Sequence, residues 1–180
     1  MLRLLLEQAQ KHSVLLFYNW ARHYAQVIDG ANGPAQPGVG LVKEIMLTLH
    51  GGVVDESLLA RAESGAAGWC TAEIFRVRGE ALLAEADAPG AAPSHSSEAL
   101  SHSGEAVLLR ALAVAQAQGA LAWELRSATS LAQLWQRRGQ AQQAHELLAP
   151  IYARFTEGYA TTDLIKVRGL LDELGAQLHA

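Results

Sequence analysis

Cysteine, proline and aromatic residues are scarce in this chain of 180 residues, and its strongly apolar runs are short. The single cysteine excludes an internal disulfide and a cysteine-rich metal cage, and it favours a reducing compartment. No apolar run approaches the roughly 20 residues that a membrane-spanning helix needs. The apolar start of the chain is interrupted at Glu7 without a cleavage site after it. We therefore expect a cytoplasmic protein with no membrane contact.

Basic residues are also too few and too scattered for a nucleic-acid surface. The chain has 14 Lys and Arg against 18 Asp and Glu, which gives a net charge of −4. Binding to nucleic acid depends on clustered Lys and Arg that neutralise phosphates. The sequence therefore predicts no nucleic-acid partner.

The residues that are abundant favour helix. Half of the chain is hydrophobic, much of it Ala and Leu, and strand-favouring residues are sparse. Apolar periodicity predicts helices near 2–11, 14–28, 38–49, 54–64, 69–85, 98–118, 121–138, 141–156 and 161–178. No strand is expected, so the predicted fold class is all-α.

The clearest pattern is a pair of helices in the second half of the chain. The segments 121–138 and 141–156 carry apolar stripes and are separated by a short turn with a glycine. Small residues such as Ala128 stand where two helices must approach, and large ones such as Leu131 and Trp135 stand where they interlock. This spacing is typical of a tetratricopeptide-type helical hairpin.

Aromatic residues repeat the pattern along the chain. Phe17, Trp69 and Trp123 each open an expected helix at a similar interval. We therefore predict an α-solenoid of antiparallel helical hairpins, stacked as a right-handed superhelix in one domain over 1–180. Residues 86–104 are rich in Pro, Gly, Ser and Ala, so we expect a flexible linker there, inside one repeat.

Helix ends have local signals as well. Gly119 and Gly139 suit the left-handed residue that closes a helix, and Asp55 or Thr162 can cap an N-terminus. Among the larger side chains, Trp123 and Trp135 have the spacing of core residues.

Several of these segments resemble a known family. The motif Trp-x2-Ala-Glu-Ile-x-Arg-Val-x-Gly-Glu-Ala-Leu-Leu at 69–83, the runs 111–120 and 123–135, and the Phe-Thr-Glu-Gly turn at 155–158 carry the resemblance. They are similar to the C-terminal tetratricopeptide-like repeat region of bacterial signalling ATPases, from about residue 54 onward. Many of those proteins carry an adenylate or guanylate cyclase domain, and others are transcription activators. The resemblance implies the regulatory C-terminal part of such a protein.

Catalytic activity does not follow from that resemblance. The chain has no Gly-x4-Gly-Lys-[Ser/Thr] loop to hold phosphates. His95 and His102 have no acidic or cysteine partner placed to complete a metal site. Cys70 adjoins Trp69 at the start of an apolar helix, where a thiol usually acts as a small buried hydrophobe. We therefore predict no catalytic residue, no cofactor and no metal, and hence no enzyme.

Binding residues are predicted on the first helices of the hairpins. In a superhelix these helices line the concave face where a protein or peptide partner binds. Arg76, Arg126 and Gln133 are the candidate partner-binding residues. Alternatively, Arg126 pairs with Glu124 or Gln133 as ordinary surface charge.

The leading hypothesis is thus a non-catalytic scaffold for protein–protein interaction in signal transduction. The alternative is a helical domain that senses a small effector, because glycine-rich breaks at 30–40 and 51–52 would make a pocket there mobile. A small enzyme and a truncated remnant without its own function are further alternatives. The sequence does not identify the partner or the oligomeric state.

Overall fold

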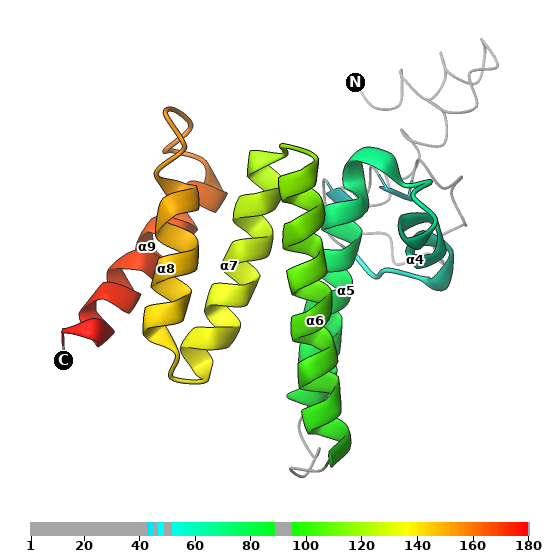
Figure 1. Cartoon of the computed structure of the whole chain (residues 1–180), viewed down its shortest axis with the longest axis horizontal. Coiled ribbons are helices and arrows are strands. Elements are labelled where there is room, and N and C mark those ends of the chain that lie inside the picture. Colours follow the sequence, from blue (N-terminus) through cyan, green and yellow to red (C-terminus); the bar gives the residue numbers. More distant parts are fainter. Residues whose placement is uncertain (1–42, 45–46, 49–51, 89–94, 180) are drawn as a thin grey trace, which may run out of the picture. The chain divides into compact units, whose positions relative to one another are not determined.

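The computed structural model describes residues 43–44, 47–48, 52–88 and 95–179, and these form helices with no strand among them (Figure 1). The predicted all-α class is confirmed for this part of the chain. The expected helices near 2–11 and 14–28 lie outside the described residues, as does most of 38–49. No helix in the described part has the length and apolar character that crossing a bilayer requires.

The chain divides into two compact units, Met1–Cys70 and Thr71–Ala180. Each unit is described by itself, and the single domain over 1–180 stays a prediction. In the first unit, α4 (Glu56–Glu63) is followed by the short 3-10 helix η1 (Gly68–Cys70). In the second unit, helices follow one another: α5 (Thr71–Ala86), α6 (His95–Ala117), α7 (Leu121–Arg137), α8 (Ala141–Tyr152) and α9 (Thr162–Leu178).

Asp55 begins α4, as the sequence predicts. Its side chain accepts a hydrogen bond from the Leu58 backbone N–H at 2.9 Å, which satisfies one of the free donors of the first turn. Hydrogen bonds from Lys43 and Ser57 stabilise the same carboxylate and lower the pKa of Asp55 to about 2. This cap and its ion pair join two helical segments of the first unit.

The first unit also buries its only cysteine. Cys70 is completely buried and donates to the Ala67 carbonyl at 3.3 Å. Burial raises the pKa of the thiol to about 12, helped by the nearby Glu44 carboxylate. The interpretation of Cys70 as a small hydrophobe is therefore confirmed.

In the second unit each helix packs against the next one in the sequence, and α5–α6 is the most extensive pair. Helix α7 also contacts both α5 and α9. Figure 1 shows α6, α7, α8 and α9 side by side in chain order. The odd-numbered helices α5, α7 and α9 thus lie next to one another as well as next to their sequence neighbours.

The core of the second unit runs between these helices. Fully buried leucines alternate with fully buried alanines; they include Leu108, Leu131, Leu148, Leu174, Ala128, Ala132 and Ala144. Trp135 is buried in the same cluster, as predicted, whereas Trp123 is only partly buried and the prediction for it is wrong. The small side chains let the helix backbones approach, and the large ones fill the space between them.

Glycines close two of the turns, as predicted. Gly119 and Gly139 have φ values of +64° and +74°, the left-handed conformation that glycine adopts without steric cost. After α7 the Gln140 N–H donates to the Trp135 carbonyl at 2.8 Å, which satisfies one of the last carbonyls of the helix.

Other helix ends differ from the prediction. Thr162 is the first residue of α9 rather than its cap; Thr161 holds the cap position, but its hydroxyl donates to the Gly158 carbonyl. The helix expected over 141–156 ends at Tyr152.

The predicted linker over 86–104 is wrong from residue 95 onward, because residues 95–104 form the first part of α6. Residues 89–94 lie outside the described residues. The physical reason is a close approach of two helices. A Cβ atom on Gly104 would lie 2.8 Å from Leu83 of α5, and one on Gly79 would lie 2.8 Å from Leu108 of α6. These glycines therefore serve packing, not flexibility.

This contact predicts opposite effects for the same substitution at two helical glycines. Gly104→Ala should destabilise the protein by about 1–3 kcal/mol, because the new methyl group overpacks the α5–α6 contact. Gly175→Ala should stabilise it by about 0.5–1 kcal/mol, because no neighbouring atom lies within 4 Å and alanine favours helix. Chemical denaturation monitored by circular dichroism measures both. Equal effects would contradict the close approach.

Candidate interaction surface on helices α5, α7 and α9

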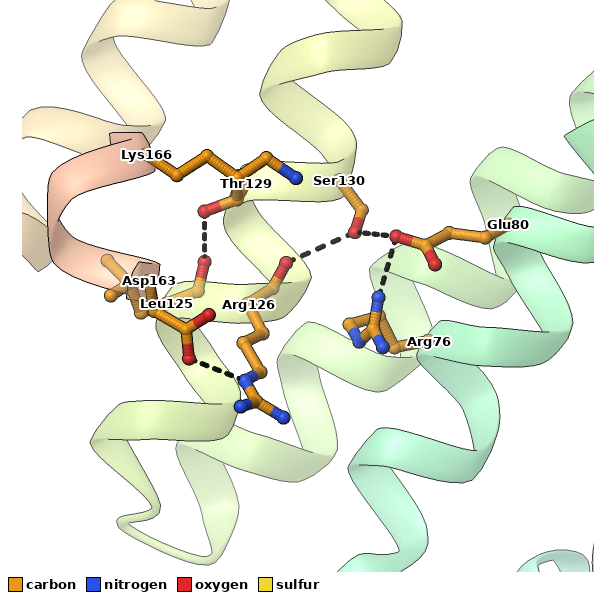
Figure 2. Close-up of a pocket in the computed structure, with 8 residues that line it drawn as sticks. All are labelled: Arg76, Glu80, Leu125, Arg126, Thr129, Ser130, Asp163 and Lys166. Atoms are coloured by element: carbon orange, nitrogen blue, oxygen red, sulfur yellow. Dashed lines mark hydrogen bonds and ion pairs between the residues drawn. The ribbon is translucent and has the colours of Figure 1, made fainter. Parts of the chain in front are cut away.

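Three helices of the second unit bring charged and polar side chains around one pocket of about 140 Å³ (Figure 2). Helix α5 contributes the right-hand side of the view, α7 the middle and α9 the left-hand side. The lining residues are Arg76, Glu80, Leu125, Arg126, Thr129, Ser130, Asp163 and Lys166.

Arg126 connects the three helices. From α7, its Nε donates to the Asp163 carboxylate of α9 at 2.7 Å, and its Nη1 lies 3.4 Å from the Glu73 carboxylate of α5. Its guanidinium carbon also lies 5.2 Å from the centre of the Trp123 ring, within the range of a cation–π interaction. Glu73 is only 2% exposed, and a carboxylate buried without such hydrogen-bonding partners would be costly.

Arg76 extends the network along α5. It donates two hydrogen bonds of 2.8 Å to the Glu73 carboxylate and forms an ion pair of 2.6 Å with Glu80. The Ser130 hydroxyl of α7 donates to Glu80 at 2.7 Å. Burial alone would lower the pKa of Arg76, but the bonds to Glu73 and the charge of Glu80 outweigh it and raise that pKa. Arg76 therefore stays charged and holds both carboxylates.

Gln133 lines a second pocket of about 270 Å³. This pocket adjoins the first, because Glu80 and Ser130 line both. Its lining residues are Glu80, Leu83, Ala84, Asp87, Ser130, Gln133 and Arg137. We call the two pockets together the α5–α7–α9 surface.

The structure thus places all three candidate residues, Arg76, Arg126 and Gln133, on this one surface. The partners of Arg126 are not the neighbours Glu124 or Gln133 suggested by sequence proximity. The nearly buried Glu124 instead accepts a bond from Arg154 at 2.7 Å.

Sequence reasoning missed the acidic half of the network. Glu73 and Asp163 each lie in the first turn of their helix, where a carboxylate is favoured by the helix dipole. The sequence therefore offered a reason to expect a carboxylate at each of these two positions. The arginine that pairs with each carboxylate could not be predicted from the sequence, because Asp163 is 37 residues and Glu73 is 53 residues from Arg126.

Comparisons of the chain with protein-family models, with curated proteins and with solved structures find no match. The chemistry of the surface is therefore the guide to function. Within the described residues, no group of three His, Cys, Asp or Glu side chains is placed to hold a metal ion.

A wider hollow of about 540 Å³ lies where α5 ends, α6 begins and α7 turns into α8. Its lining residues are Ala86, Asp87, Glu98, Ser101, His102, Arg138 and Gln140. Nearly all of them are polar, whereas small-molecule sites are mostly apolar with a few polar groups.

Near this hollow, Glu105 of α6 joins α6 to the end of α7. It accepts a bond from the Trp135 indole N–H at 2.7 Å and one from Arg138 at 2.5 Å. Burial alone would raise the pKa of Glu105, but these two bonds and the Arg138 charge outweigh it and lower that pKa.

Arg126 should matter for stability more than a surface arginine does. Arg126→Met keeps the aliphatic stem but removes both ion pairs, so we expect a loss of about 1–2 kcal/mol in the free energy of unfolding. The matched control is Arg78→Met, because Arg78 lies 3.7 Å from the exposed Glu85 and should change little. Urea denaturation of the three proteins measures the difference, and equal losses would contradict the network.

Glu105 should make stability depend on pH. Because its pKa is lower in the folded protein, its contribution is complete above the unfolded pKa of about 4.3 and is lost as the pH falls below it. Wild type should therefore exceed Glu105→Gln in unfolding free energy at pH 7, and the gap should narrow towards pH 3. Glu85→Gln, at an exposed position, is the control. A gap that does not vary with pH would contradict this role of the charge.

Proposed function

We propose that this protein is a non-catalytic, tetratricopeptide-like scaffold whose α5–α7–α9 surface binds a protein or peptide partner. The observation that carries the proposal is the pair of adjoining pockets across these helices, held in shape by the network around Arg126.

The helix arrangement supports the scaffold part of the proposal. Successive helices pack against each other, while α7 additionally contacts α5 and α9. In an α-solenoid the first helices of successive hairpins adjoin in this way and line the concave face. The odd-numbered helices are those first helices in our proposal, which makes their shared surface the partner site.

Pocket size favours a polypeptide over a small effector. The pockets of about 140 and 270 Å³ fall below the roughly 300–1,000 Å³ of small-molecule sites. Adjoining hollows of this size suit successive side chains of an extended or helical partner. Small-effector sensing remains the alternative, and the glycine-rich segments that suggested it lie almost entirely outside the described residues.

The chemistry of the surface supports a non-catalytic role. Two of its carboxylates, Glu80 and Asp163, and the buried Glu73 beside them each hold an arginine rather than a nucleophile and a base. The Ser130 hydroxyl donates to Glu80 and has no histidine beside it on the lining. Following the resemblance described above, the partner in our proposal is a signalling protein or another part of the same polypeptide.

A bulky residue in the second pocket of the surface tests the proposal. Peptides selected on the wild-type protein from a random phage-displayed library should lose at least about tenfold in affinity for Gln133→Trp, equivalent to 1.4 kcal/mol. Gln143→Trp, at an exposed position of α8, is the matched control and should retain binding. Titration calorimetry with the synthetic peptides measures the affinities. Peptides that bind both variants equally, or no enrichment at all, would contradict the site.

A thermal-shift screen with a metabolite library separates the alternative. A metabolite that raises the melting temperature of wild type, with no peptide enriched, would favour the small-effector function instead.

A further inference from the structure

Helix α9 has one exposed face in the described part of the unit. Its buried residues, Leu164, Val167, Leu170 and Leu174, face the core. At helical spacing the opposite face carries Thr162, Ile165, Gly169 and Ala176, and all four are exposed. Ile165 is 59% exposed, and a Cβ atom on Gly169 would have no neighbour within 4 Å.

The charges that flank this face are ordered along the helix. Lys166, which also lines the first pocket, and Arg168 lie in its first half, whereas Asp172 and Glu173 lie in its second half. Within the described residues, no ion pair involves any of these four side chains. Glu173 accepts one amide hydrogen bond, from Gln136 at 3.2 Å.

We propose that this face of α9 binds the same face of a second copy of the chain, with the two helices antiparallel and related by a two-fold axis at Gly169. Reversal about Gly169 brings position 166 of one copy opposite position 173 of the other on one flank. On the other flank, Arg168 comes within side-chain reach of Asp172 of the second copy. When one helix is reversed, the positive half of each copy therefore lies opposite the negative half of the other. The two-fold symmetry makes each ion pair occur twice.

The shape of the face suits the same pairing. Ile165 of each copy comes opposite the space between Gly169 and Ala176 of the other copy. Since neither residue has a side chain larger than a methyl group, that space can receive the isoleucine as a knob between small residues. The glycine at the axis lets the two backbones approach closely.

A second copy accounts for these features better than an unrelated partner. A parallel arrangement would place like charges opposite each other, which disfavours it. The contact is also short, because the 17 residues of α9 span about 25 Å. One helix face of that length buries less area than the roughly 800 Å² per partner of a standard interface. The dimer should therefore be weak, and its population should depend on concentration. This inference does not rest on the proposed partner site.

Sedimentation equilibrium of the full chain over a range of concentrations tests the pairing. Wild type should pass from monomer to dimer, and Ile165→Glu should weaken dimerisation at least about tenfold. Lys166→Glu and Glu173→Lys should each weaken it as well, because each places like charges together. The double variant Lys166→Glu/Glu173→Lys restores opposite charges and should regain most of the wild-type affinity. Far-ultraviolet circular dichroism checks that each variant is folded.

Cross-linking tests the position of the axis. Only a residue at the two-fold axis meets its own counterpart, so Gly169→Cys should give a covalent dimer with a short bis-maleimide. Gln143→Cys on α8 is the control and should not, and neither should the buried native Cys70.

Four results would overturn the proposal. A chain that is monomeric at every concentration would remove the dimer. A dimer that Ile165→Glu leaves unchanged would place the interface elsewhere. Failure of the folded double variant to recover affinity, or equal cross-linking at positions 169 and 143, would exclude the antiparallel register.

Discussion

The second unit depends on one arginine that reaches across three helices. Arg126 of α7 holds a carboxylate of α5 and a carboxylate of α9, and the ring of Trp123 supports its guanidinium. A nearly buried carboxylate such as Glu73 is costly without partners. The network therefore makes the spacing of α5, α7 and α9 specific, since other spacings would leave that charge unpaired.

Small residues determine how closely the helices approach one another. Gly79 and Gly104 allow α5 and α6 to approach more closely than any side chain would permit. Alanines do the same between α7 and its neighbours, where Ala128, Ala132 and Ala144 are completely buried. The apolar core thus sets how near the helices lie, and the ion pairs set which of them meet.

Helix α9 contributes to two surfaces in our proposals. Its inner edge supplies Asp163 and Lys166 to the α5–α7–α9 surface. Its outer face carries Ile165 and Gly169, where we place the contact with a second copy. A dimer formed through that face would present two partner sites, so a partner with two binding segments would gain affinity from binding both at once. The weak dimer and the modest pockets are compatible with such a cooperative use.

The sequence by itself determined the helices, the turns and much of the core, because these depend on neighbours in the chain. The apolar period predicts α7 and α8, glycine at 119 and 139 predicts the turns that close α6 and α7, and the position of Trp135 predicts its burial. The same local reasoning misread the start of α6, since a glycine that serves a helix contact looks like one that serves a loop.

Only the tertiary structure decided which charged residues meet. Arg126 was a candidate from the sequence, but its partners lie 37 and 53 residues away, and no local period encodes such a distance. Arg76 and Gln133 likewise come together on one surface only because α5 packs against α7. The local sequence thus determines the helices and turns, whereas the pairing of distant side chains depends on how the completed helices pack.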